Sequence, residues 1–341
     1  MSIRTQQAVA PSSPPEEQSA NWVRSLFGNQ QFALLIALVA LVAFFTSRNS
    51  VFFSSDVAAN ILTDWCSIVL LGVGETFVII SGGIDLSVGS VAGLSGIIGA
   101  FAMREMAGNQ PEAVVLITGT IVCAAVGLGI GYINAALMNY ARLVPFVATL
   151  ATLGAAAGMS IVLTGGSPIG QDSDAITFTQ SVFGPFSYPS LIVIAIVVIS
   201  GIFLHYSRFG RYTFAIGSSP FAARAAGINV RRHLTSVYML SGMLAGLTGM
   251  FIYLRLGSGA PSAGSGGELK AIAAVVIGGV VLTGGVGRLS GTVLGALIIT
   301  TVTSGLLISN VEANWNQVAV ATLIAAAATL QALRPSSRQE S

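Results

Sequence analysis

Runs of apolar residues without a single charge constrain this chain more than any other feature. Residues 32–47, 191–204 and 292–308 lack charged side chains, and each lies within a longer apolar segment. A helix needs about 20 mostly apolar residues to cross a bilayer. Only 8% of the residues are charged, against about 25% in an average soluble domain. The sequence therefore predicts an all-helical, polytopic integral membrane protein.

The apolar segments predict about ten membrane-spanning helices. Residues 31–334 form the predicted membrane domain, 1–30 a disordered cytoplasmic tail and 335–341 a cytoplasmic C-terminal tail. The first apolar run lacks a small-residue cleavage site, and further spans follow it, which favours a membrane helix over a removed signal peptide. The predicted spans are 31–47, 57–81, 87–105, 112–139, 145–164, 189–206, 234–255, 269–282, 290–309 and 315–333.

Basic residues in the loops predict the orientation, because loops on the cytoplasmic side carry the excess of Lys and Arg. With the N-terminus inside, four basic residues lie outside: Arg48, Arg104, Arg255 and Lys270. The inner loops and tails then hold Arg4, Arg24, Arg142, Arg208, Arg211, Arg224, Arg231, Arg232, Arg288, Arg334 and Arg338. Both termini are therefore predicted to be cytoplasmic, as an even number of spans requires.

An internal echo suggests two related halves. The stretch SGGIDLSVGSVAGL begins at Ser81, and TGGVGRLSGTVLGAL begins at Thr283. Each is predicted to be a tight turn between two helices at the cytoplasmic edge, with Ser87 and Ser290 as helix caps. Asp85 would then lie near the inner water boundary and accept hydrogen bonds from backbone N–H groups. Chance similarity between two glycine-rich turns is the alternative.

Motifs for catalysis, metal binding and nucleotide binding are absent from the sequence. It contains no HExxH, no CxxC and no nucleophile elbow. A Walker A loop needs a lysine in G-x-x-x-x-G-K-[ST], whereas the only lysine lies in GELKAI. The two cysteines, Cys66 and Cys123, lie in apolar segments and are expected to be buried thiols. The chain is therefore predicted to be neither an enzyme nor a cofactor or metal protein, and any ATP it uses must be bound by another polypeptide.

Acidic residues within the predicted spans are few. Asp64 and Glu75 are the clearest, with Asp85 at an edge. Carboxylates inside a membrane are candidates for function, such as the coupling site of a cation-driven transporter. Glu75 is the best candidate, and a structural hydrogen bond to a neighbouring helix is an equal alternative.

The inner loop at 205–236 contains a short predicted helix within SSPFAARAAG. Ser219 is its expected cap, Pro220 takes the first helical position and Gly227 ends it. The apolar face would consist of Phe221, Ala225 and Ile228, with Arg224, Arg231 and Arg232 around it. Such a helix could dock into a groove on a cytoplasmic partner. Alternatively, the arginines only follow the positive-inside pattern on a loop that lies against lipid headgroups.

Three stretches resemble the permease subunits of bacterial ABC importers for ribose, xylose, galactose and related sugars. They are 74–96 (GETFVIISGGIDLSVGSVAGLSG), 210–230 (GRYTFAIGSSPFAARAAGINV) and 266–298 (GGELKAIAAVVIGGVVLTGGVGRLSGTVLGALI). The resemblance extends over roughly 33–333. The chain departs from the family's pattern at Ser218-Ser219 and Ser304-Gly305, where the family often has Asn, and this leaves the sugar unspecified.

The resemblance implies a subunit of an importer in the inner membrane that works by alternating access. The implied partners are a second permease subunit, identical or different, a cytoplasmic ATP-binding subunit, and a periplasmic or extracellular sugar-binding protein; no nucleic acid is expected. The loop 208–234 would couple to the ATPase, with contacts expected from Ser219, Pro220, Phe221, Ala222, Arg224 and Gly227. A sugar's hydroxyls need polar partners on leaving water, so the path is predicted along Asn60, Thr63, Glu75, Asp85, Asn134 and Thr149.

The alternative function is a cation-coupled secondary transporter of a small polar solute, with Glu75 as its coupling site.

Overall fold

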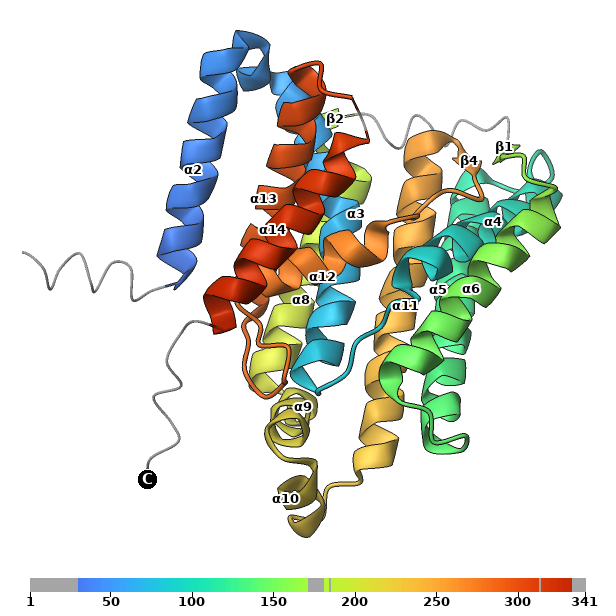
Figure 1. Ribbon diagram of the computed structural model, residues 1–341. Coiled ribbons are helices and arrows are strands. Elements are labelled where there is room, and N and C mark those ends of the chain that lie inside the picture. The colour runs from blue at the N-terminus through green and yellow to red at the C-terminus, as the bar shows by residue number, and fades with distance from the viewer. Residues whose placement is uncertain (1–29, 171–180, 184, 313, 333–341) are drawn as a thin grey trace, which may run out of the picture.

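Helices make up nearly all of the regular structure (Figure 1). The structure, a computed structural model, describes residues 30–170, 181–183, 185–312 and 314–332. Most of the predicted N- and C-terminal tails therefore lies outside the described residues. The helices are α2 (Gln30–Arg48), α3 (Ser55–Ile80), α4 (Val88–Met106), α5 (Glu112–Asn139), α6 (Pro145–Thr164), α8 (Tyr188–Tyr206), α9 (Arg208–Ser218), α10 (Pro220–Ala225), α11 (Val230–Leu256), α12 (Gly267–Ile277), α13 (Leu289–Ile308) and α14 (Trp315–Ala332), with a 3-10 turn at Ser50–Phe53.

The strands are short and pair at the upper end of the bundle in Figure 1. Strand β1 (Ile169–Gly170) pairs antiparallel with β4 (Ser258–Gly259) and so joins the segment after α6 to the segment after α11. Strand β2 (Ser181–Phe183) pairs with β3 (Phe186–Ser187), directly before α8. The predicted outer loop 165–189 contains three of these strands, and its residues 171–180 lie outside the described part of the chain.

Seven of the described helices are long and apolar enough to cross a membrane, which confirms a polytopic membrane protein. They are α2, α3, α5, α6, α8, α11 and α13. A helix lies at each of the ten predicted spans, but α4, α12 and α14 fall short of that standard. The number ten and the orientation of the termini therefore remain predictions.

The predicted span at 269–282 is wrong in its length. Helix α12 has 11 residues and ends at Ile277, because Gly278 and Gly279 close it with N–H bonds back to Ala274 and Val276. At 1.5 Å per residue such a helix measures about 16 Å, roughly half of the hydrocarbon core. Helix α12 therefore reaches only part of the way through the bundle, and the chain crosses the remainder as a loop.

Glycines allow the central helices to pack with their backbones in contact. Gly127 and Gly131 lie one turn apart on α5, and a Cβ on either would overlap backbone atoms of α11 near Gly242 and Tyr238. Between them, Gly129 faces open space. Small residues at such positions let membrane helices approach closely, so the glycines of α5 allow it to pack directly against α11.

The two echoed turns lie against each other. The chain leaves α3 at its lower end, turns at Gly82 (φ 87°) and climbs back to the start of α4 (Figure 1). The second turn contains Gly284 (φ 88°), and a Cβ on it would be 3.0 Å from the Cα of Gly82. Positive φ values are strained for any residue with a side chain. The shared TGG and SGG sequences therefore build one junction from two distant parts of the chain.

Candidate functional site

Helix α10 forms where the local sequence predicts it. Ser219 caps the helix by accepting a hydrogen bond from the Ala222 N–H at 3.2 Å, and Pro220 occupies the first helical position. The helix ends at Ala225, and Gly227 follows with φ 83°. Its N–H donates to the Arg224 carbonyl at 2.9 Å. A side chain other than glycine's would strain this turn, so Gly227 fixes the end of the helix.

One face of α10 is packed and the other is free. Ala223 is buried with Ile216 and Val230, and Ile228 packs against this cluster. Ile228 therefore does not belong to the exposed apolar face on which the sequence predicts it. Helix α10 lies at the lowest point of the bundle (Figure 1), and its Phe221 is 82% exposed. The free face thus consists of Phe221 with the exposed Pro220, Ala222, Arg224 and Ala225.

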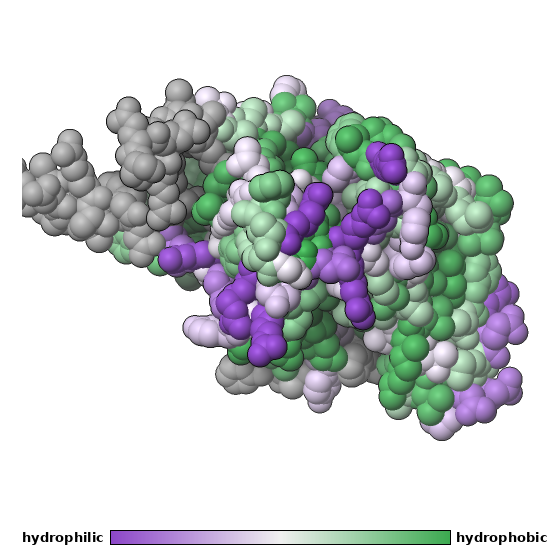
Figure 2. Space-filling model, turned by 90° about the horizontal axis from the view of Figure 1, so that it is seen from below, coloured by the Kyte–Doolittle hydropathy of each residue, from purple (hydrophilic) through white to green (hydrophobic). Residues whose placement is uncertain are grey.

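Exposed arginines surround α10. Figure 2 shows hydrophilic side chains gathered on the lower face of the molecule. The exposed arginines at this end are Arg142, Arg208, Arg211, Arg224, Arg231, Arg232 and Arg288. The one ion pair among the described residues joins Arg255 to Asp64, near the upper end of the bundle. The seven arginines of the lower end therefore have no carboxylate partner within the described part of the chain. The lower face is basic and suits an acidic surface.

A backbone junction connects the segment before α10 to the membrane helices. A Cβ on Gly217, near the end of α9, would overlap the carbonyl oxygen of Ile80, the last residue of α3. The N–H of Gly285 donates to the same carbonyl at 2.8 Å. A Cβ on Gly285 would lie 2.5 Å from the Ser218 hydroxyl. These contacts join the segment directly before α10 to the end of α3 and to the turn before α13.

Asp85 lies at the centre of a buried polar network. Its Oδ1 accepts hydrogen bonds from the backbone N–H of Ser87 (3.0 Å) and from the Ser87 hydroxyl (2.6 Å). Its Oδ2 accepts from the Ser241 hydroxyl of α11 at 3.1 Å. The Asp85 N–H donates to Glu75 Oε1 at 3.1 Å. Asp85 and Glu75 are both 0% exposed, so the prediction of an Asp85 at the inner water boundary is wrong: the chain climbs back into the bundle after Gly82.

The same network continues into α5 and α6. Asn134 donates to the Ser87 hydroxyl at 2.9 Å, and Thr152 donates to Asn134 at 2.6 Å. Thr149 donates to the Ile84 carbonyl at 3.3 Å. Since buried polar groups need such partners, these bonds hold the re-entering segment in place among four helices.

Ser87 occupies the N-cap position of α4 as predicted, without a side-chain cap bond, whereas the predicted cap at Ser290 is not formed. Ser87 uses its hydroxyl on Asp85 and makes no cap bond to α4. Helix α13 begins at Leu289 with Arg288 as its cap residue, so Ser290 already lies inside the helix. There its hydroxyl accepts a hydrogen bond from Gln31 of α2.

The predicted path residues fall into two groups. Glu75, Asp85, Asn134 and Thr149 belong to the buried network, each 0% exposed. Asn60 and Thr63 lie near the upper end of α3, where both line a cavity of about 280 Å³. The structure thus does not bring the six together.

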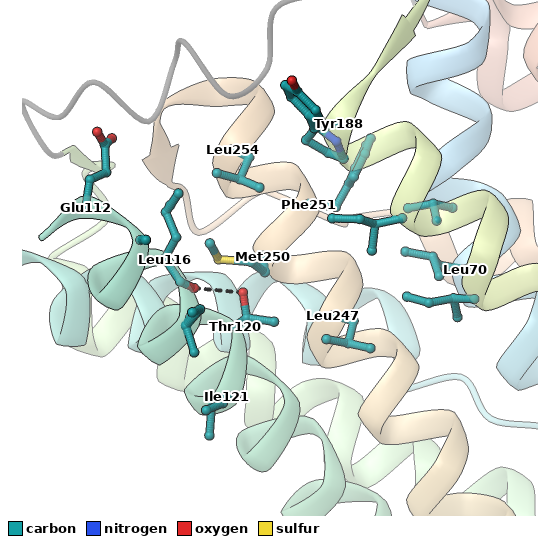
Figure 3. Close-up of a pocket in the computed structure, with 16 residues that line it drawn as sticks. Leu70, Glu112, Leu116, Thr120, Ile121, Tyr188, Leu247, Met250, Phe251 and Leu254 are labelled. Atoms are coloured by element: carbon teal, nitrogen blue, oxygen red, sulfur yellow. Dashed lines mark hydrogen bonds between the residues drawn. The ribbon is translucent and has the colours of Figure 1, made fainter. Parts of the chain in front are cut away.

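A large apolar cavity lies between α5, α8 and α11 (Figure 3). Its volume is about 660 Å³, and its walls include Leu116, Leu247 and Phe251. The Thr120 hydroxyl in its wall already donates to the Leu116 carbonyl within α5, at 2.8 Å. Hydroxyl-rich solutes need hydrogen-bond partners, and apart from Glu112, Thr120 and Tyr188 the side chains that line this cavity are apolar, so it is a poor route for a sugar.

Some residues of the polar network and of the backbone junction could not be identified from the sequence. Ser241 meets Asp85 across 156 positions, and nothing in its surroundings distinguishes it from other small residues of a membrane helix. Gly217 had a weak local signal, since it stands just before the cap of α10. Gly285 had a stronger one, because the echoed TGG motif contains it.

Comparison with known proteins gives the family. The sequence model for the permease component of the branched-chain amino acid transport system matches residues 57–327. The ribose import permease RbsC of Escherichia coli K12 is 36% identical over 298 residues, covering 85% of this chain and 90% of its own length. The D-allose permease AlsC of the same organism is 35% identical, with coverages of 89% and 92%. The fructose import permease FrcC of Rhizobium meliloti is 33% identical, with coverages of 85% and 82%. The chain therefore belongs to the family of membrane-embedded transport permeases that this model describes, which includes these sugar permeases.

Proposed function

We propose that this chain is the membrane-spanning subunit of an ATP-driven importer for a sugar or polyol, located in the inner membrane. The free face of α10 is the observation that carries the proposal. A short helix with an 82% exposed phenylalanine is placed beyond the membrane helices and fixed to them by a backbone junction. The sequence relatives of the whole chain include permeases for ribose, allose and fructose. An exposed aromatic residue of this kind suits a groove on a partner protein.

A separate ATPase subunit supplies the energy in this proposal. The chain has no Walker A lysine, so ATP is bound elsewhere. Closure of two ATPase domains displaces α10, and the contacts of Gly217 and Gly285 with Ile80 carry that displacement to α3 and α13. The helices then change which side of the membrane the path opens to. A sugar-binding protein delivers the substrate to the upper end, and a second permease subunit completes the pathway.

Uptake into proteoliposomes tests this function. The permease is reconstituted with its ATPase subunit and binding protein, and accumulation of radiolabelled ribose, allose and fructose is measured. We expect one of them to accumulate only with ATP present, and collapse of proton and sodium gradients by ionophores to leave uptake intact. Uptake that needs no ATP and stops when the gradients collapse would instead identify a cation-coupled transporter.

A further inference from the structure

The upper half of α3 carries a polar stripe in an otherwise apolar helix. Asn60, Thr63, Asp64 and Ser67 follow the spacing of one helix face. Two neighbouring cavities open along this stripe, and Arg255 of α11 lines both of them. The cavity of about 280 Å³ has Asn60, Thr63 and Ser187 in its wall. The cavity of about 310 Å³ has Asp64, Ser67, Ser265, Lys270, Thr303 and Ser304.

An ion pair lies at the boundary of the two cavities, because Arg255 lines both and Asp64 lines the second. Arg255 donates to Asp64, and their side chains are 37% and 34% exposed. Both are therefore accessible from the cavities, unlike the carboxylates of the buried network. Ser67 lines the second cavity, and its hydroxyl oxygen is buried there without a hydrogen-bond partner among the described residues.

We propose that these two cavities form a binding site for a monosaccharide, in which Asp64 and Arg255 bind its hydroxyl groups. The proposal rests on the proposed function and adds to it the place where the sugar first meets the permease. Sugar hydroxyls both donate and accept hydrogen bonds, and the walls offer a carboxylate, a guanidinium, an amide and several hydroxyls for both roles. Each cavity lies at the lower limit of the roughly 300–1,000 Å³ of small-molecule sites, which suits a monosaccharide.

The charges around the site are nearly balanced, because Asp64 pairs with Arg255 and Glu268 interacts with Lys270, and this balance favours a neutral ligand. A cation would meet Arg255 and Lys270, and an anion would meet Asp64. Asp64 and Arg255 neutralise each other as an ion pair, and each has further acceptor or donor positions for hydroxyl groups while the pair stays intact. Because Arg255 lines both cavities, a sugar that moves from the first into the second keeps this partner throughout.

A matched pair of threonines provides the test. Thr63 lines the polar cavity and Thr120 lines the apolar one. Each hydroxyl donates to the carbonyl four residues earlier at 2.8 Å, so Thr63→Val and Thr120→Val make the same local change. The reconstituted importer is assayed with whichever of ribose, allose and fructose the unaltered protein accumulates. We expect Thr63→Val to lower uptake several-fold, Arg255→Gln to lower it on the order of tenfold, and Thr120→Val to leave it unchanged. ATP hydrolysis stimulated by the binding protein should persist in all three.

Protection from chemical labelling gives a second readout that does not depend on transport. Thr63→Cys and Thr120→Cys are treated with a water-soluble thiol reagent with and without the sugar; the native Cys66 and Cys123 are buried. The sugar should slow labelling at position 63 and have no effect at position 120. Normal uptake by Thr63→Val and Arg255→Gln, or labelling at position 63 that the sugar does not slow, overturns the site while the importer function stands. Absence of ATP-dependent uptake by the unaltered protein overturns both.

Discussion

Gly217 is the residue at which movement of α10 is expected to enter the membrane domain. A Cβ there would overlap the Ile80 carbonyl oxygen, so Gly217→Ala must push α9 away from α3. Overpacking of this kind costs about 1–3 kcal/mol, and we expect uptake to fall by roughly tenfold or more. Binding of the ATPase subunit should survive, because α10 itself is unchanged.

Gly158→Ala is the matched control for that substitution. Gly158 lies within α6 and has no atom within 4 Å of the position of an added Cβ. The same change of one methyl group should therefore leave uptake as it was. Equal uptake by the Gly217 and Gly158 variants would show that the backbone junction does not transmit movement.

Asp85 is expected to stabilise the fold rather than to lie free in a pathway. Its two oxygens accept three hydrogen bonds from Ser87 and Ser241. Asp85→Asn turns one acceptor into a donor that faces a buried group, which costs about 1–3 kcal/mol in the free energy of unfolding. Thermal unfolding in detergent measures the loss. Asp56→Asn, at an exposed position in the first turn of α3, should change stability by no more than about 0.5 kcal/mol.

Helix α10 is the element through which the importer should be driven. Arg224→Glu reverses the charge on its free face, and Gly227→Pro cannot adopt the φ of 83° that ends it. Both variants should reach the membrane yet show no ATP-dependent uptake, and Arg224→Glu, at an exposed position, should also unfold at the temperature of the unaltered protein. The control is Arg104→Glu, which changes an exposed arginine in the last turn of α4, outside the lower group of arginines. If both α10 variants transport normally, the helix has no part in coupling.

Elements encoded by adjacent residues were predictable from the sequence. The Ser219-Pro220 start and the Gly227 end of α10 act within a few residues, and the structure confirms them. Such signals are local, so one sequence suffices to find them.

Elements whose position depends on distant partners were not predictable. The segment after Gly82 turns back into the bundle because Ser241 and Asn134, far along the chain, satisfy Asp85 and Ser87 there. Its residues alone suit a turn at the membrane surface equally well. The short α12 was missed because the apolar residues continue past Ile277, although the helix does not. A hydropathy profile detects the run of apolar residues but not the residue at which the helix ends.

Charge at the scale of the whole molecule predicts how the ATPase subunit binds. The seven exposed arginines at the lower end have no carboxylate partners within the described residues. Attraction between exposed charges is screened at distances beyond about 3 Å in 1 M salt and about 10 Å in 0.1 M salt. Binding of the purified ATPase subunit should therefore weaken as salt is raised, which titrations by fluorescence anisotropy measure. Affinity that is independent of salt would assign the contact to Phe221 and its apolar neighbours alone.

The proposed mechanism requires a separate ATPase subunit to bind α10 from the cytoplasm, and cross-linking tests this contact most directly. A photoreactive amino acid is placed at Phe221, and the assembled importer is irradiated in membranes. The control position is Phe53, which is 77% exposed and belongs to the turn that joins α2 to α3 at the upper end of the bundle (Figure 1). We predict a covalent adduct between the ATPase subunit and the probe at position 221, and none with the probe at position 53. Adducts at position 221 with lipid or with this chain alone would contradict the claim.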